Sequence, residues 1–538
     1  MKKFKLLMSL ATMCLAIAVL CFGVFSATQV NYNIGGTISY EVTDAFVKVN
    51  TKVYKGTNLY NRGQLELLSE DFANGTKTLA SEGFSQDTSF SFDEFDSTNS
   101  SAFTKENINL NFSSTNKSYV VEMDIQNLSP SVNVWAIAEW SVDDNSNVVQ
   151  GNNVMQKAIT STESKKIYYA ISVEDFKSGM QNVSYTMNLK LGNGDYSRSQ
   201  ENLAKINISS DNKVTPKENI TGLVVIPEDC KIISAETQSM PNGDSTIDVP
   251  ISPFAKSGAT ILVLPSTVES CQTMCVIGCQ KVTRITGVET YGSNQMFYGQ
   301  TGIYSARAKS NGDGVLGSTY AMCSNLEAID FGDITDIYEL SFMSCGLKGE
   351  LNIPGTIRTI RASAFLNNEK ISTIRLQEGV KDIEIDCFDE CYSVRNIYFP
   401  KTLTSIVNGS PFGTSFNEIN RDSNEEVNLY IEDLSNLLGY NYIIASCEKG
   451  INLYVNNVLV KDVTIPSTST KIGEYAFYTM NIESVTIPTS ITEIGQQAFE
   501  GCLRLKTINY QGTQEQWNAI TKGDAWGSSD IEIKYNVQ

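Results

Sequence analysis

The sequence predicts a mainly β protein, with an N-terminal β-sandwich domain followed by a C-terminal solenoid of short repeats. Before residue 210, β-favouring runs alternate between apolar and polar residues, and polar turns separate them. After residue 223, a skeleton of Ile-Pro, Ile, Ile-Gly and Ala-Phe recurs every 22–24 residues in its clearest copies. The 538 residues, 41% of them hydrophobic, are enough for two or three domains.

The first element is an apolar N-terminal segment. Lys2, Lys3 and Lys5 precede an apolar run over residues 6–25. This layout is typical of a secretory signal, and a run of about 20 apolar residues is also long enough to span a bilayer. Residues 1–27 are therefore expected to be either a cleaved signal peptide or a retained membrane anchor. Both alternatives predict an extracellular or cell-surface protein that meets the membrane only through this segment.

Residues 28–210 are expected to form the β-sandwich domain. Alternating segments over residues 46–54, 119–125 and 183–191 predict strands with one buried face. Several such strands, separated by polar turns and lacking a repeat, favour an antiparallel sandwich. Residues 211–222 are polar and break the alternation, so we expect them to be a linker.

The repeats over residues 223–538 are expected to stack into a solenoid. In the clearest copy Ile487 ends a short alternating strand, Pro488 stops the strand because it has no N–H to donate, and Phe499 plugs the interior. A unit this small buries its apolar face only against its neighbours. The inward position of successive units is filled by Val276, Phe297, Tyr320, Phe342, Phe365, Phe388, Phe412, Phe477 and Phe499.

The pattern Ile-Pro-x-x-Ile-x-x-Ile-Gly-x-x-Ala-Phe-x-x-Cys, present at residues 487–502, resembles the BspA-like leucine-rich repeats of bacterial surface proteins. The resemblance covers residues 223–538 and implies a leucine-rich-repeat solenoid. It also implies an inserted hairpin near residues 413–462, a terminal unit near residues 508–538 closed by Trp526, and adhesion to proteins or to host and cell surfaces.

Composition excludes several kinds of chemistry. The chain contains no histidine, which excludes Ser-His and Cys-His catalytic pairs and His-ligated metals. Its net charge of −19 repels a phosphate backbone, so no nucleic-acid partner is expected. No phosphate loop or metal-ligand spacing stands out, so we expect a non-enzymatic protein without a cofactor or a metal.

The cysteines follow the repeat register. Five of them lie three residues after the inward position, and we expect them to be small buried side chains rather than metal ligands. They are Cys279, Cys323, Cys345, Cys391 and Cys502. Stacked strands lie about 4.8 Å apart, which puts cysteines of adjacent units within disulfide range. Whether Cys323 and Cys345 form a disulfide is therefore left open.

The outward positions of the stacked strands form the predicted partner-binding row. Side chains between the buried strand positions point outward, and stacking aligns them along the solenoid. The row consists of Asp330, Asn352, Arg375, Tyr398, Thr464, Thr486 and Asn509. Arg375 and Tyr398 lie on adjacent rungs and are residue types enriched in interface hot spots. The alternative is an ordinary solvated sheet surface.

These features predict a secreted or surface-anchored, adhesin-like bacterial protein that binds a protein or glycan partner through its solenoid. A rigid row of contacts loses little ordering entropy when a partner binds. The alternative is a structural component of an extracellular matrix, which would assemble into fibres by strand addition through the N-terminal β domain.

Overall fold

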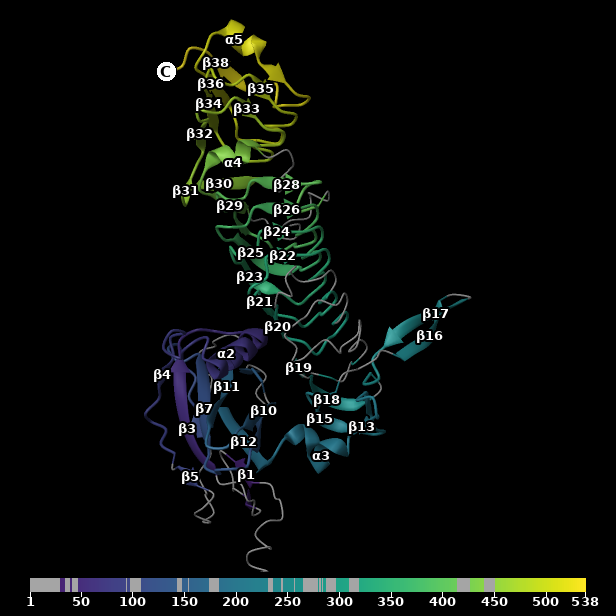
Figure 1. Ribbon diagram of the computed structural model, residues 1–538. Helices are drawn as coiled ribbons and strands as arrows, with labels where there is room; N and C mark the ends of the chain where they lie inside the picture. The colour runs from purple at the N-terminus through teal and green to yellow at the C-terminus, as the bar shows by residue number, and fades with distance from the viewer. Residues whose placement is uncertain are drawn as a thin grey trace, which may run out of the picture. The chain divides into compact units, whose positions relative to one another are not determined.

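The structure is a computed structural model that describes most of the chain (Figure 1). The described residues are 30–33, 39–40, 47–92, 94–96, 108–142, 148–152, 154–173, 183–230, 236–242, 245–255, 257–264, 279, 282, 284–286, 297–308, 319–413, 426–439 and 450–538. The predicted signal or anchor segment lies outside them. None of the described helices is both long enough and apolar enough to cross a membrane.

The chain divides into two compact units. The first contains the residues up to Asn207 together with Val224–Pro227. The second contains Ile208–Leu223 and Glu228–Gln538, and therefore includes all of the clear repeats.

The predicted linker, residues 211–222, contains regular structure. β14 (Val214–Pro216) lies within this range, and β15 (Thr221–Val225) begins in it. The elements just before it are η1 (Tyr196–Arg198), α3 (Gln200–Leu203) and β13 (Ile206–Ile208). β13 and β14 pair with each other, so strand pairing occupies a stretch that the sequence predicts to be irregular.

The first unit contains two antiparallel sheets, each with six described strands. The first sheet has the order β10-β8-β12-β1-β2, with β6 also paired to β12. Its strands are β1 (Val30–Asn33), β2 (Ser39–Tyr40), β6 (Ile108–Leu110), β8 (Val134–Val142), β10 (Val154–Ile159) and β12 (Val183–Asn193). The second sheet has the order β4-β3-β7-β11-β9, with β5 also paired to β3. Its strands are β3 (Val47–Gly56), β4 (Ser85–Gln86), β5 (Phe95–Asp96), β7 (Ser118–Asn127), β9 (Val148–Gln150) and β11 (Ser164–Val173).

The two sheets pack face to face over one apolar core. Met123 of the second sheet and Ala138 of the first belong to the same buried cluster. Trp140 and Tyr169, one from each sheet, stack with ring centroids 4.8 Å apart. Opposed inner faces that share a core are the arrangement of a β-sandwich, and the prediction of a mainly β fold is confirmed.

A helix that was not among the predicted elements covers the outer face of the second sheet. α2 (Arg62–Asn74) buries Leu65, Leu68 and Phe72 in a second apolar cluster. The sheet contributes Tyr168 to that cluster. The helix begins at Asn61, whose side chain and that of Gln64 form a capping box, which is a strong local start signal.

The second unit starts with short sheets. β15 pairs with β18 (Gly258–Val263), which pairs in turn with β19 (Arg284–Thr286). Two further strand pairs lie in this part of the chain. They are β16 (Glu236–Asn242) with β17 (Ser245–Ile251) and β20 (Ser305–Arg307) with β21 (Ala328–Asp330). The β18–β19 and β20–β21 pairs are already parallel, as in the repeats that follow.

The solenoid then builds two ladders, in which all strands are parallel except the last strand of the first ladder (Figure 1). The first ladder has the order β23-β25-β27-β29-β30-β31. Its strands are β23 (Lys348–Ile353), β25 (Lys370–Leu376), β27 (Asn396–Tyr398), β29 (Val427–Ile431), β30 (Ile451–Val455) and β31 (Val458–Leu459). The second ladder has the order β32-β34-β36-β38. Its strands are β32 (Asp462–Thr464), β34 (Ser484–Ile487), β36 (Thr507–Tyr510) and β38 (Glu532–Lys534).

A second, shorter strand in most repeats forms its own parallel sheets. One sheet contains β22 (Asp336–Ile337), β24 (Thr359–Ile360), β26 (Asp382–Glu384) and β28 (Ser405–Val407). The other contains β33 (Lys471–Ile472), β35 (Glu493–Ile494) and β37 (Thr521–Lys522). In most units this strand follows an apolar residue of the predicted skeleton, as Ile357 precedes β24 and Val380 precedes β26, so the repeat pattern indicates both strands of a unit.

The inward aromatic side chains stack along the solenoid as predicted. Ring centroids are 5.2 Å apart for Phe297–Tyr320, 5.5 Å for Tyr320–Phe342, 5.4 Å for Phe342–Phe365, 5.7 Å for Phe365–Phe388, 5.6 Å for Phe388–Phe412 and 5.2 Å for Phe477–Phe499. All of these rings are buried. Burial of one such side chain stabilises the fold by roughly 1.5–3 kcal/mol. Val276 lies outside the described residues.

The inserted hairpin predicted near residues 413–462 is wrong for the two longer strands described in that range, residues 427–431 and 451–455. β29 and β30 are parallel neighbours in the first ladder. They keep the repeat register because Asn428 pairs with Asn452, 24 residues later, and α4 (Leu434–Gly439) lies between them. An antiparallel pair does form, but between β30 and the two-residue β31.

The C-terminal end of the solenoid is covered by aromatic side chains. Trp526 lies edge-to-face against Phe499, with ring centroids 6.4 Å apart. It also contacts Trp517 of α5 (Gln514–Ala519) at 5.8 Å. The last ring of the inward stack is therefore shielded by indole rings.

The described cysteines of the repeat register are free thiols. Cys323 donates to the carbonyl of Phe297 at 3.0 Å, and Cys502 donates to that of Phe477 at 2.9 Å. Asn368 occupies the same position in another repeat, and its Nδ2 donates to the carbonyl of Phe342 at 2.9 Å. The position thus supplies a small buried donor to the preceding unit.

Cys345 follows the same rule as Cys323, since its thiol donates to the carbonyl of Tyr320 at 3.2 Å. The two thiols, which could have formed a disulfide, each bond a backbone carbonyl instead. Burial raises the pKa of Cys323 to about 12, which suppresses the thiolate that metal binding and disulfide exchange require.

Candidate partner-binding site

The outer face of the first ladder carries three stacked tyrosines. Tyr398, Tyr430 and Tyr454 occupy the same register position on β27, β29 and β30. The centroids of Tyr398 and Tyr430 lie 4.2 Å apart, and those of Tyr430 and Tyr454 lie 4.5 Å apart. We call these three side chains the tyrosine row.

Arg375 extends the row by one rung. Its guanidinium lies over the Tyr398 ring, 3.6 Å from the centroid. Its Nε donates to Glu350 at 2.7 Å. The hydrogen bond to the Glu350 carboxylate raises the pKa of Arg375, so the cation is retained at every accessible pH. Glu350 and Tyr398 together fix the position of the guanidinium.

An asparagine ladder runs beside the tyrosine row on the same face. Asn396, Asn428 and Asn452 lie two residues before the three tyrosines, so both sets point outward. Asn428 donates to Asn396 and Asn452 donates to Asn428, each at 3.1 Å. Asn481 continues the chain by donating to Asn452 at 3.2 Å. These bonds hold neighbouring rungs in register, so the row is ordered before any partner binds.

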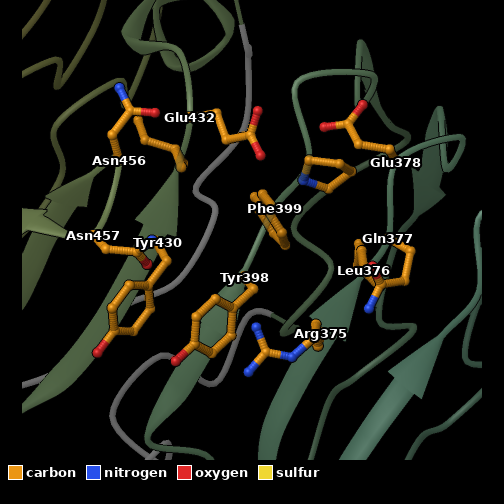
Figure 2. Close-up of a pocket in the computed structure, with 12 residues that line it drawn as sticks. Arg375, Leu376, Gln377, Glu378, Tyr398, Phe399, Tyr430, Glu432, Asn456 and Asn457 are labelled. Carbon is orange, nitrogen blue, oxygen red and sulfur yellow. The ribbon is translucent and has the colours of Figure 1, made fainter.

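A pocket of about 280 Å³ lies where the strands of the first ladder end, and we call it the strand-end pocket. Tyr398 and Tyr430 line one side of it. Figure 2 shows these two rings side by side, with the carboxylates of Glu378 and Glu432 at the opposite end of the view from the tyrosine hydroxyls. The pocket therefore joins an aromatic wall to an acidic end.

Amide side chains complete the strand-end pocket. Asn456 and Asn457 form the turn between β30 and β31, and both have positive φ, 50° and 63°. Asparagine adopts this left-handed conformation more readily than most residues, which suits a two-residue hairpin turn. Their exposed amides can donate to and accept from a partner's backbone.

The structure places the seven predicted row residues in three separate groups. Asn352, Arg375 and Tyr398 are successive partners in the first ladder. A second group, Thr464, Thr486 and Asn509, is in register in the second ladder. Asp330 belongs to the β20–β21 pair, where its carboxylate bonds Arg307 at 3.0 Å. Their role in partner binding stays a prediction.

Sequence reasoning missed Tyr430 and Tyr454, because both lie in the range interpreted as an inserted hairpin. The sequence nevertheless contains a signal that places these two tyrosines in the row. Residues 396–399, 428–431 and 452–455 read Asn-Ile-Tyr-Phe, Asn-Leu-Tyr-Ile and Asn-Leu-Tyr-Val. Aligning these three segments would have identified the two later strands as rungs of the same ladder.

The outward tyrosine hydroxyls are hydrogen-bond donors. Burial, followed by the neighbouring Tyr398, raises the pKa of Tyr430, so its hydroxyl stays protonated and can donate a hydrogen bond. In the part of the chain that the structure describes, no three His, Cys, Asp or Glu side chains lie together in a way that could hold a metal ion.

Comparisons with known proteins agree with the repeat architecture. The family model for the BspA type leucine rich repeat region matches in six copies, over residues 248–367, 315–431 and 450–522. No curated protein matches the chain.

Solved structures include similar bacterial proteins. A leucine rich cell surface protein from Faecalibacterium prausnitzii A2-165 is 19% identical, with 59% of this chain and 95% of that chain covered and a TM-score of 0.25. A leucine-rich repeat protein from Bacteroides ovatus is 17% identical, with 62% and 98% covered and a TM-score of 0.24. The pneumococcal vaccine antigen PcpA is 13% identical, with 62% and 80% covered and a TM-score of 0.24. Since these TM-scores are low, the family assignment is made on the repeat model. The solenoid of this chain belongs to the BspA-type leucine-rich repeat family.

Proposed function

We propose that this chain is an adhesin-like, non-enzymatic protein of the bacterial cell surface that binds a protein or glycan partner through the first ladder. The observation that carries the proposal is the stack of Arg375, Tyr398, Tyr430 and Tyr454 on one outer face. Tyrosine and arginine are enriched in interface hot spots. Rings already held by their neighbours lose little side-chain entropy on binding, so most of their contact energy goes into affinity.

A cell-surface location is supported by two features. The apolar segment at residues 6–25 has the layout of an export signal or membrane anchor. The similar protein from Faecalibacterium prausnitzii is described as a cell surface protein. The location is tested by fractionating cells that make the full chain and by antibody labelling of intact cells.

The alternative proposal, fibre assembly by strand addition through the N-terminal β domain, has weaker support. The described edge strands β2, β4, β5, β6 and β9 are two or three residues long, and β10 has six residues. Short edge strands limit strand addition. Concentration-dependent growth of large assemblies of the full chain, blocked by a proline in β10, would favour the fibre instead.

The binding proposal is tested with the full chain against extracellular-matrix proteins, glycans and whole cells. One variant combines Arg375→Glu with Tyr398→Ala. The matched control combines Thr486→Ala with Asn509→Ala, which alters the equivalent outward positions of the second ladder. We expect saturable binding that the first variant weakens by about tenfold or more, as loss of hot-spot residues does. Equal binding by both variants would contradict a first-ladder site.

A further inference from the structure

Both ring faces of Tyr398 and of Tyr430 are already covered by neighbouring side chains. The Arg375 guanidinium lies on one face of Tyr398 at 3.6 Å, and Tyr430 lies on the other at 4.2 Å. Tyr430 is in turn enclosed between Tyr398 and Tyr454. Sugars recognised by aromatic residues stack on a free ring face. Tyr398 and Tyr430 offer their edges and hydroxyls instead, which favours a peptide over a glycan.

The aromatic edge continues into an exposed apolar turn. Leu459 of β31 is the cross-strand partner of Tyr454, and its side chain is 43% exposed. Val458 beside it is 65% exposed. The tyrosine row therefore ends in an apolar rim that can cover apolar side chains of an extended segment.

The acidic end of the strand-end pocket has spare capacity for a cation. Glu378 accepts one hydrogen bond, from the backbone N–H of Lys401 at 2.9 Å. Glu432 lies 3.9 Å from Nζ of Lys401, whose side chain is 63% exposed. An exposed pair of this kind contributes little to stability, so another cation can replace Lys401 at little cost.

The other charges around the pocket do not oppose a cation. Arg375 is paired with Glu350 at 2.7 Å, which neutralises it locally. Five charged side chains surround the pocket, and their three carboxylates and two cations give a net charge of −1. They are Glu350, Glu378, Glu432, Arg375 and Lys401. The whole chain carries −19, which draws positively charged partners towards its surface.

We propose that the strand-end pocket receives a lysine or arginine side chain from an extended basic segment of a protein partner. Apolar residues that flank this cation lie along the edges of the tyrosine row and on Leu459. Asn456 and Asn457 bond the backbone of the segment. This inference rests on the proposed function, and it specifies the partner's chemistry at the same surface.

The test uses the full chain and fluorescent peptides. The probe is acetyl-Leu-Lys-Val-Lys-Leu-amide, and two counterparts replace both lysines with glutamine or with glutamate. One variant combines Glu378→Gln with Glu432→Gln, which keeps the shape of both side chains and the acceptor for the Lys401 N–H. The matched control combines Glu474→Gln with Glu493→Gln, which removes the same charge from exposed positions of the later repeats.

We expect the lysine peptide to saturate one site per chain at physiological salt. Its dissociation constant should rise by about tenfold in the Glu378/Glu432 variant and by less than about threefold in the control, since a local pair matters more than net charge. Tyr398→Ala should also weaken it. Failure to saturate, equal loss in both carboxylate variants, or equal binding of the glutamine peptide would overturn the proposal.

The panel of natural partners distinguishes this failure from failure of the proposed function. A protein partner whose binding needs Arg375 and Tyr398, but survives Glu378→Gln with Glu432→Gln, refutes the basic segment and keeps the first-ladder site. A glycan that binds this surface would also refute the basic segment and keep the first-ladder site. Absence of any partner from the whole panel refutes the proposed function itself.

Discussion

The two ladders of the solenoid have cores of the same kind but differ in the residues on their outer faces. Both contain stacked, buried phenylalanines, such as Phe388 in the first and Phe499 in the second. The outer row of the first ladder is Asn352, Arg375 and then three tyrosines, whereas that of the second is Thr464, Thr486, Asn509 and then a lysine. The repeat therefore constrains the inward positions and leaves the outward positions available for recognition.

The largest expected effect tests whether the core is common to both ladders. Phe365 lies between Phe342 and Phe388, and Phe499 lies between Phe477 and Trp526. Truncation of either ring to alanine should lower the free energy of unfolding by about 3–5 kcal/mol, because a cavity replaces a buried ring. Urea unfolding of the full chain, followed by circular dichroism, measures both changes. A large loss in one ladder and almost none in the other would show that the cores are not equivalent.

The buried thiols predict a loss of stability at alkaline pH in both ladders. Burial raises the pKa of Cys391 and of Cys502 to about 12. In the unfolded chain a thiol ionises near pH 8.5, so above that pH the unfolded state alone loses the proton. Stability is therefore complete below about pH 8.5 and falls by about 1.4 kcal/mol per pH unit and per thiol up to the folded pKa.

The measurement is the free energy of unfolding between pH 8 and 11 for the wild type, Cys391→Asn and Cys502→Asn. Each variant should lose stability less steeply than the wild type, since one ionisable thiol is gone. Identical slopes for all three chains would mean that these thiols ionise as readily in the folded state as in the unfolded one.

A smaller effect tests the donor role of the cysteine position. The Cys502 thiol donates to the Phe477 carbonyl, as Asn368 does to the Phe342 carbonyl in the first ladder. Cys502→Ala should lower the free energy of unfolding by about 0.5–1.5 kcal/mol, the usual net contribution of one hydrogen bond. Cys502→Asn should recover most of that loss, because Asn368 shows that an amide fits this position. Equal losses in both variants would indicate that packing, and not donation, decides the residue.

Most of the solenoid could be predicted from the sequence because its inward positions repeat. A stacked side chain must match its neighbours in size, so Phe365 and Phe388 recur at a fixed spacing. The outward positions face no such constraint. Tyr430 was missed because the step from β27 to β29 is 32 residues, from Asn396 to Asn428, instead of 23 or 24.

Local signals in the first unit were harder to use. α2 is capped at Asn61, but its apolar face is interrupted by the buried, ion-paired Glu66. That weakens the helical period that a sequence pattern reveals. Asp330 was placed in the predicted row although its strand, β21, pairs with β20 and not with the first ladder, and pairing depends on tertiary context.

The smallest expected effect concerns the ion pair that links the two ladders. Glu426, next to β29, accepts from Asn452 at 2.8 Å and from Arg504, in the turn before β36, at 2.6 Å. The hydrogen bond from Asn452, followed by that from Arg504, lowers the pKa of Glu426, so its contribution is present above its unfolded pKa and is lost as the pH falls.

Both side chains of the Glu426–Arg504 pair are more than a third exposed, at 37% and 46%. Arg504→Ala should therefore change the free energy of unfolding by less than about 1 kcal/mol. The matched control is Lys534→Ala, whose exposed pair with Glu532 lies within the second ladder. If Arg504→Ala cost several times more than Lys534→Ala at pH 7, and this difference vanished at acidic pH, Glu426 would be coupling the ladders. Equal small losses of stability would indicate that core packing, and not this ion pair, joins the two ladders.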